Sequence, residues 1–422
     1  MKKQKLIFFT SLVFIIIGIG CANSATNSRM IILESPQEDL SSTDIAATTV
    51  LTDDIKTEKK AKEKYVRGIH LSAWVSGSEK YRNVAAALFN NTELNTAVID
   101  IKEYEGEVYI DGIKIVNLND AYVKAIPNLE KYIADLKEKG VYTIARIVVF
   151  RDNTMTRKNP ELAVKNPDGT IWVDRKGVAW LDPYNKNSWD YNLQIAQRAV
   201  NIGFEEIQFD YIRFPSDGNT KNCCYSKPHS TVEASKALVG FLKEANKRLK
   251  AKDKDAKISI DVFGLTTTAS DDMGIGQKIV EMTQWVDYVS PMVYPSHYEK
   301  WNYGIVEPNK EPYKIVYYAL EGALKRIPNE KLRPWLQDFS LGYKYGKNEV
   351  RAQVQACYDN KVGSWLLWNP RCIYTKDALK GQEDENTYQQ SDPPTPEMLK
   401  TEKSKQPIEE KTEQSTATGL RP

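Results

Sequence analysis

Histidine is scarce in this chain, with 3 residues among 422, and 5 cysteines add few further metal ligands. Their spacings match none of the usual metal-binding patterns, so we expect no metal site and no cofactor. The charges nearly cancel, with 58 Lys and Arg against 56 Asp and Glu. Such a balance argues against a nucleic-acid-binding protein that relies on a broad basic face. No feature points to a protein partner.

The N-terminus has the pattern of an export signal. Lys2, Lys3 and Lys5 precede an apolar run at residues 6–19, which is short for a membrane span and typical of a signal peptide. The run ends in Gly20-Cys21, which resembles a bacterial lipoprotein signal with a lipid-carrying cysteine. We therefore expect a signal at residues 1–21, lipidation of Cys21 and a membrane-anchored protein of the cell envelope. Gly18 departs from the usual leucine, so secretion or an uncleaved anchor are alternatives.

Two polar segments flank one long region with globular composition. Residues 22–64 are rich in Ser, Thr, Asp, Glu and Lys and are predicted to form a flexible tether, while residues 381–422 are predicted to be a disordered tail. The folded domain is therefore expected at residues 65–380. Tyr and Trp, at 23 and 9, outnumber the 11 Phe, which favours surfaces that are partly apolar and partly wet. Of the cysteines in this domain, Cys357 and Cys372 could form a disulfide.

Eight short apolar runs alternate with amphipathic stretches across this domain. Such an alternation predicts an α/β fold, and over some 300 residues a (β/α)8 TIM barrel fits better than an open doubly wound sheet. The predicted strands are 68–74, 96–102, 143–150, 206–214, 257–265, 286–294, 333–339 and 364–369. The predicted helices are 122–139, 188–201, 231–251, 312–326 and 348–360.

Long loops are predicted after the third and fourth strands, at residues 151–187 and 215–230. In a barrel of this kind such loops lie at the C-terminal face, where active sites are built. The first of them contains Trp172 and Trp180, which we expect to form exposed aromatic platforms.

Polar residues interrupt the apolar strands with a period of two. Strands of a parallel barrel are buried on both faces, so a charge there must be paired or reach the mouth. If the apolar alternates face the helices, one ring of polar side chains meets inside the barrel mouth. An alternative is a structural ion-pair network in which the two cations neutralise two carboxylates. The expected ring comprises Asp100, Lys102, Arg146, Asp210, Asp261 and Gln337.

Asp210 and Asp261 lie late in neighbouring strands and are the predicted catalytic pair. Cleavage of a glycosidic bond needs one carboxylic acid to protonate the leaving oxygen and one carboxylate to attack the anomeric carbon or activate water. Tyr211 and the positively charged Arg213 follow Asp210, which we therefore assign as the nucleophile or base. Asp261 has apolar sequence neighbours and is assigned as the acid.

Five segments, taken in order, resemble a bacterial family of glycoside hydrolase domains, a TIM-barrel group distantly related to the α-amylase-like hydrolases. The resemblance implies a barrel that acts on polysaccharides, with the nucleophile at the end of the fourth strand, Asp210, and the acid at the end of the fifth, Asp261. Many relatives have Glu as the acid, so Asp338, Glu103 and Glu105 are reserve candidates. The segments are YVRGIH at 65–70, VIDIK at 98–102, FDYIRFP at 209–215, DVFG at 261–264 and SPMVYP at 290–295.

Aromatic residues at strand ends complete the predicted site. Trp74, Tyr294 and Trp368 are expected to bind substrate, because aromatic faces stack on sugars, and Tyr211 and Arg213 are expected to bind beside Asp210. The sequence thus predicts a glycoside hydrolase acting on a polysaccharide or oligosaccharide. The alternatives are a non-catalytic carbohydrate-binding barrel of the envelope and a purely structural envelope protein.

Overall fold

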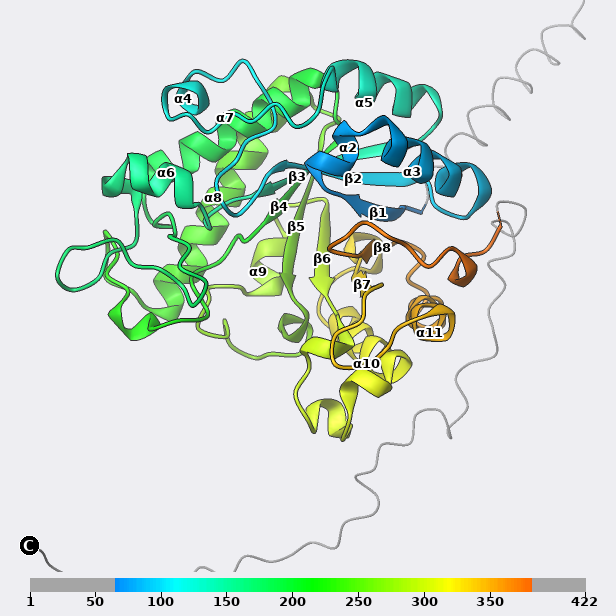
Figure 1. Cartoon of the computed structure of the whole chain (residues 1–422). Helices are drawn as coiled ribbons and strands as arrows, with labels where there is room; N and C mark the ends of the chain where they lie inside the picture. Colours follow the sequence, from blue (N-terminus) through cyan, green and yellow to red (C-terminus); the bar gives the residue numbers. More distant parts are fainter. Residues whose placement is uncertain (1–64, 382–422) are drawn as a thin grey trace, which may run out of the picture. The chain divides into compact units, whose positions relative to one another are not determined.

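A computed structural model describes residues 65–381. The predicted signal with Cys21, the tether and the tail from residue 382 lie outside the described residues. Within them, eight parallel strands close into a barrel in the order β1 to β8, with the helices arranged around it (Figure 1). The predicted (β/α)8 barrel is confirmed, and the open doubly wound sheet is excluded.

All eight predicted strands are present, most of them shorter than expected. Almost every strand residue is buried, since one face packs on the helices and the other fills the barrel. The strands are β1 (Arg67–Leu71), β2 (Thr96–Lys102), β3 (Tyr142–Val148), β4 (Glu206–Asp210), β5 (Lys257–Phe263), β6 (Tyr288–Met292), β7 (Trp335–Gln337) and β8 (Trp365–Trp368).

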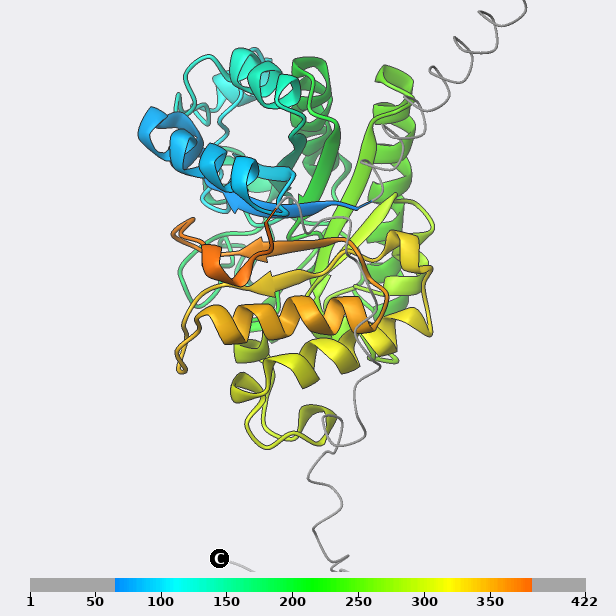
Figure 2. The same ribbon diagram turned by 90° about the vertical axis from the view of Figure 1, so that its right-hand side faces the viewer.

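The five predicted helices are also present, at α5 (Leu129–Glu138), α7 (Lys186–Ile202), α8 (Thr231–Lys252), α10 (Pro312–Leu324) and α11 (Lys347–Asp359). The ends of two follow from local chemistry: Ser230 caps α8 by accepting from the Glu233 amide, and Gly203, at φ +108°, ends α7. Helix α3 (Glu79–Asn91), whose buried face is narrow, was not predicted. The shorter helices are α2 (Ala73–Gly77), α4 (Lys114–Leu118), α6 (Asn153–Lys158) and α9 (Ile279–Thr283). Figure 2 shows α10 and α11 side by side below the strands.

The two long connections after β3 and β4 are folded segments. Antiparallel bridges join Arg151 to Trp180 and Val173 to Ala179 within the first, and Lys165 to Cys224 across the two. Trp172 and Trp180 are each only 2% exposed, and both indole N–H groups donate to neighbouring loop residues. The expectation that these tryptophans form open platforms is therefore wrong, because the loops pack over them.

A β-bulge in β2 separates two residues that strict alternation places together. Asp100 pairs with Arg146 of β3, but Lys102 pairs with Ile147, so β2 contains one extra residue at this point. The Lys102 side chain consequently points out of the barrel interior. Outside it, Lys102 forms an ion pair at 2.8 Å with Asp152. Lys102 is fully buried there and also donates to the Val148 carbonyl at 2.6 Å. Its predicted place in the mouth is wrong.

The floor of the barrel contains a closed ion pair. Arg333 donates to both carboxylate oxygens of Glu206, and Ser259 and Tyr142 donate to the same carboxylate. Arg333 and Glu206 are 1% and 0% exposed. The two charges cancel and the acceptors are occupied, so this pair belongs to the packing of the barrel.

The cysteines of the described region, Cys223, Cys224, Cys357 and Cys372, are all free. The predicted pairing of Cys357 with Cys372 is wrong: Cys357 is buried within α11, whereas Cys372 lies in the loop after β8. None of the described helices has the length and apolar character needed to cross a bilayer.

Candidate active site

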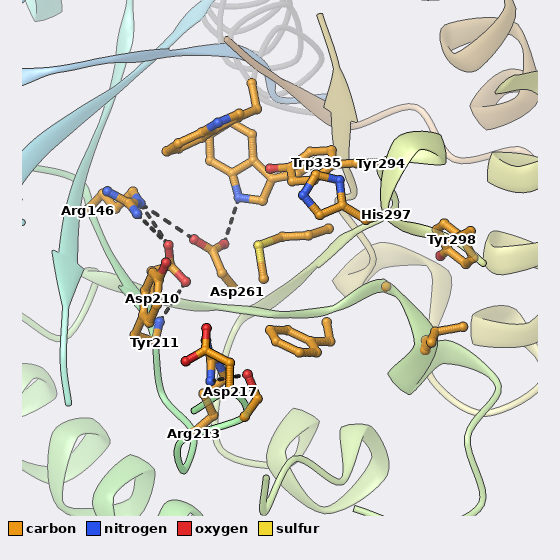
Figure 3. A pocket seen from close by; sticks show the side chains of 16 residues that line it. Arg146, Asp210, Tyr211, Arg213, Asp217, Asp261, Tyr294, His297, Tyr298 and Trp335 are labelled. Carbon is orange, nitrogen blue, oxygen red and sulfur yellow. Dashed lines mark hydrogen bonds and ion pairs between the residues drawn. The ribbon is translucent and has the colours of Figure 1, made fainter. Parts of the chain in front are cut away.

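A cavity of about 420 Å³ opens at the C-terminal mouth of the barrel, a size typical of small-ligand sites (Figure 3). Its wall combines carboxylates and guanidinium groups with aromatic rings. The lining residues are Arg146, Asp210, Tyr211, Arg213, Ser216, Asp217, Asp261, Phe263, Gly264, Leu265, Met292, Tyr294, His297, Tyr298, Trp335 and Trp368.

Arg146, inside the barrel on β3, holds Asp210 at the end of β4. Its Nη2 and Nε atoms donate to the same oxygen of Asp210, Oδ2, at 2.5 and 3.1 Å. The other oxygen, Oδ1, accepts from the backbone amide of Tyr211 at 2.6 Å. Asp210 is only 4% exposed, so these donors fix its carboxylate at the cavity wall.

Asp261, on β5, occupies a different environment in the same wall. Its Oδ1 accepts from the indole N–H of Trp335 at 2.7 Å, and its Oδ2 lies 4.0 Å from Nε of Arg146 (Figure 3). Burial and the charge of Asp210 raise the pKa of Asp261 well above its ordinary value, against the opposing effects of Arg146 and Trp335. Because the indole only donates, Oδ1 is an acceptor and the proton of the neutral acid belongs on Oδ2.

The two carboxyl groups face each other across one guanidinium. Nε of Arg146 is 3.1 Å from Asp210 Oδ2 and 4.0 Å from Asp261 Oδ2, so the two oxygens lie no farther apart than these distances combined. Paired carboxyl groups of glycosidases are separated by roughly 5–9.5 Å. The separation of Asp210 and Asp261 is thus below the upper limit of this range.

Tyr211 and Arg213 shape the wall below Asp210. Tyr211 has φ +50°, a left-handed conformation that is uncommon outside glycine and that turns the chain directly after the carboxylate. Arg213 lies 4.8 Å from the Trp180 ring, 4.9 Å from Tyr211 and 4.7 Å from Phe263. Its Nη1 donates to the Phe214 carbonyl and to Ser216 Oγ, both at 3.0 Å. The guanidinium is therefore rigidly placed at the cavity edge.

Asp100 orients Arg146 from the side away from the cavity. It accepts from Nη1 of Arg146 at 2.6 Å and from His70 Nε2 at 2.7 Å. Asp100 is 1% exposed and does not line the cavity, so it fixes the cation that the other carboxylates share.

The structure brings together seven of the residues predicted for the site. These are Arg146, Asp210, Tyr211, Arg213, Asp261, Tyr294 and Trp368. Asp100, Lys102, Gln337 and Trp74 do not line the cavity. Asp100 supports Arg146 and Lys102 lies beyond the bulge, as described above. Gln337 is buried and accepts from the Ser296 amide at 3.1 Å. Trp74 is 60% exposed in α2, away from the cavity lining, because β1 ends before it.

None of the reserve acid candidates lines the cavity. Asp338 accepts from the Thr375 amide and hydroxyl at 2.8 and 2.6 Å. Glu103 is half-buried beside Asp100, and burial together with that charge raises its pKa to about 8. Glu105 is exposed. Of the residues considered for the role of acid, Asp261 is thus the one that shares the cavity wall with Asp210.

Trp335 is the main residue of the site that sequence analysis missed. Its indole holds Asp261, and its ring lies 5.4 Å from that of Trp368. The alternation that placed Gln337 inside the barrel also applies two residues earlier, so the signal was present in the sequence. Asp217, on the loop after β4, had no comparable pattern. Across the described residues, no three His, Cys, Asp or Glu side chains are grouped to hold a metal ion.

The fold and the paired carboxylates define a (β/α)8 barrel of the glycosidase type. The sequence profile of a family described as "Putative glycosyl hydrolase domain" matches residues 68–374, more than half of the chain. The chain belongs to this family.

The fold agrees with that of a solved glycoside hydrolase domain. The glycoside hydrolase domain of PgaB (BpsB) from Bordetella bronchiseptica aligns with a TM-score of 0.56 at 11% identity, over 75% of this chain and 99% of that one. A hypothetical protein from Ruminiclostridium thermocellum is 36% identical over 46% of this chain and 97% of its own, with a TM-score of 0.40. The α-galactosidase TtGalA from Thermus thermophilus aligns at 0.46 and 11% identity, over 75% and 63%. No protein of curated function matches the sequence.

Proposed function

We propose that this protein hydrolyses glycosidic bonds of a polysaccharide or oligosaccharide, with Asp210 and Asp261 as the catalytic pair. The observation that carries the proposal is that the two carboxyl groups have different hydrogen-bond partners and different electrostatic environments. Asp210 accepts two hydrogen bonds from a guanidinium, whereas Asp261 faces an indole and has a raised pKa. Such a difference between neighbouring carboxyl groups separates an acid from a nucleophile or base.

In the proposed reaction Asp261 is the general acid and gives its Oδ2 proton to the glycosidic oxygen. The Asp210 carboxylate attacks the anomeric carbon or removes a proton from an attacking water. Arg146 keeps Asp210 in place throughout, and the Trp335 indole prevents Asp261 from rotating. Tyr294 and Trp368 line the cavity and offer aromatic faces to the sugar ring.

A panel of plant and bacterial polysaccharides, screened with the purified chain for release of reducing ends, tests the proposal. We expect turnover of at least one glycan and its loss in Asp210→Asn and Asp261→Asn. Proton NMR of the first anomer formed then distinguishes attack by Asp210 from attack by water. Turnover that persists in Asp210→Asn contradicts the assignment.

A non-catalytic carbohydrate-binding barrel gives a different result in the same experiment. Such a protein binds a glycan of the panel, and Asp210→Asn binds it equally well, but the wild type releases no reducing ends. A purely structural role is disfavoured by the cavity itself, which is open and lined by Trp335, Trp368, Tyr211, Tyr294 and Tyr298.

We further infer that the chain is exported and attached to a membrane through a lipid on Cys21. The support is the basic start, the apolar run at residues 6–19 and the Gly20-Cys21 pair. Fractionation of cells producing the full chain tests this: wild type is expected with membranes, and Cys21→Ala without lipid. A Cys21→Ala chain of unchanged mass and location overturns the inference.

A further inference from the structure

A cysteine, a histidine and an aspartate form a line beside the cavity. The Sγ atom of Cys372 lies 3.8 Å from Nδ1 of His70, whose Nε2 lies 2.7 Å from Oδ2 of Asp100. The three come from the loop after β8, from β1 and from β2, so the closed barrel brings them together. The glycosidase mechanism above uses neither the thiol nor the imidazole.

The sulfur of Cys372 is held in place by the groups around it. Cys372 has φ +54°, a left-handed turn that is uncommon for a residue with a side chain, and it is half-buried. The backbone amide of Ser72 donates to Sγ at 3.3 Å. A backbone N–H and an imidazole thus face the same sulfur, and both stabilise a thiolate.

His70 faces this sulfur as a cation. Burial alone lowers the pKa of His70, but the charge of Asp100 and the hydrogen bond to it outweigh burial and raise the pKa to about 10. The imidazole also stacks on Trp368, with ring centroids 4.0 Å apart. A protonated imidazole with a carboxylate behind it and a thiol in front is the arrangement that activates cysteine nucleophiles.

We propose that Cys372 is a nucleophilic thiol, activated by the His70–Asp100 pair, and that it takes up small disulfide compounds as a mixed disulfide. The sulfur attacks one sulfur of the compound, a new S–S bond forms to Cys372 and the original S–S bond breaks. The leaving thiolate departs with the electron pair and takes up a proton from the solvent, to which the Cys372 thiol gives its own, so no further oxidant is needed.

An adduct at this position lies against the wall of the cavity. His70 is in contact with both the sulfur and the Trp368 ring, and Trp368 lines the cavity. Modification of Cys372 is therefore also expected to change how the cavity holds its ligand.

The reaction of the native chain with dithiobis(nitrobenzoate), followed by peptide mass mapping, tests the proposal. Cys224 is the internal control, since it is exposed and free. We expect Cys372 to react about tenfold faster than Cys224 near pH 6. A rate for Cys372 no higher than that of Cys224 overturns the proposal.

The pH profile of the wild type provides a second measurement that needs no variant. The charged or titratable groups around the pair are Asp100, Glu103, Arg146, Asp338 and Tyr374. Of these, Glu103 has a pKa of about 8, so the rates are compared between about pH 5.5 and 7. With His70 protonated throughout this range, we expect Cys372 to react faster than Cys224 at both pH values.

His70→Gln removes the cation and is expected to lower the Cys372 rate to that of Cys224, and Cys372→Ser removes the fast phase. An unchanged fast phase in a folded His70→Gln chain overturns the proposal. If that variant does not fold, the wild-type rates at the two pH values decide, and a rate for Cys372 no higher than that of Cys224 at both values contradicts the proposal.

Discussion

The floor and the mouth of the barrel both contain buried arginine–carboxylate groups, but their charges balance differently. At the floor, Arg333 pairs with one carboxylate, that of Glu206, which also accepts from Ser259 and Tyr142. At the mouth, Arg146 is shared by Asp100, Asp210 and Asp261, and a cavity opens beside them.

This difference separates a structural ion pair from a reactive one. A neutral pair whose carboxylate oxygens already accept several hydrogen bonds has no reason to bind a proton or a ligand. Three carboxylates around one arginine leave a negative excess, which the mouth relieves by holding a proton on Asp261, as the raised pKa of this group indicates. The proton held in this way is the one that the proposed reaction uses.

The largest expected effect is a loss of glycoside hydrolysis when a carboxylate at the mouth of the barrel is replaced. Asp210→Asn keeps the shape of the side chain but removes the charge, so we expect kcat/KM to fall about 10³-fold. Initial rates on a glycan that the wild type cleaves measure this. Asp217→Asn, in the same cavity but without a bond to Arg146, is the control and should lose far less. A loss below about tenfold for Asp210→Asn would place the chemistry elsewhere.

The structural role of the ion pair at the floor is tested by the free energy of unfolding. Glu206→Gln leaves Arg333 buried without a carboxylate, and we expect the free energy of unfolding to fall by about 3–5 kcal/mol. Denaturant titration measures the change. Asp135→Asn breaks the exposed pair with Lys131 and should cost less than about 1 kcal/mol. Equal effects of the two substitutions would show that the floor pair is not structural.

The proton on Asp261 predicts a smaller, pH-dependent effect. Because its pKa in the folded chain is raised above the ordinary 3.8, the folded state keeps a proton that the unfolded state releases. The stability of the wild type therefore falls as pH rises above this value. Asp261→Asn carries no such proton and should be more stable than the wild type by about 1 kcal/mol or more at pH 7, but not at pH 4. Unfolding curves at both pH values measure this, and a pH-independent difference would refute it.

The smallest effect is expected outside the mouth. Trp74 is exposed and does not line the cavity, so Trp74→Ala should change KM by less than about twofold. Trp368→Ala, which removes a cavity wall, is the matched comparison and should raise KM more. Equal changes in KM would show that the substrate extends over α2.

The fold was predictable because barrel strands are apolar on both faces and recur between helices. The same logic found Asp210 and Asp261, which lie late in neighbouring strands. It failed for Lys102 because alternation assumes an unbroken register, and for Trp172 and Trp180 because a sequence does not show which loops pack over others. The contact between His70 and Cys372 joins the first and last strands of the barrel, so no local pattern predicts it.

The bulge in β2 changes which face of the strand its last side chain occupies. Val98 and Asp100 face the inside of the barrel, whereas Lys102, which strict alternation would place beside them, forms its ion pair with Asp152 outside it. A single extra residue thus lets one strand serve two separate contacts: Asp100 binds Arg146 inside the barrel, and Lys102 binds Asp152 outside it. Removing one residue at the bulge would restore the regular register of β2 and turn the ammonium group of Lys102 toward Arg146. The present spacing of β2 avoids the resulting repulsion between two buried cations.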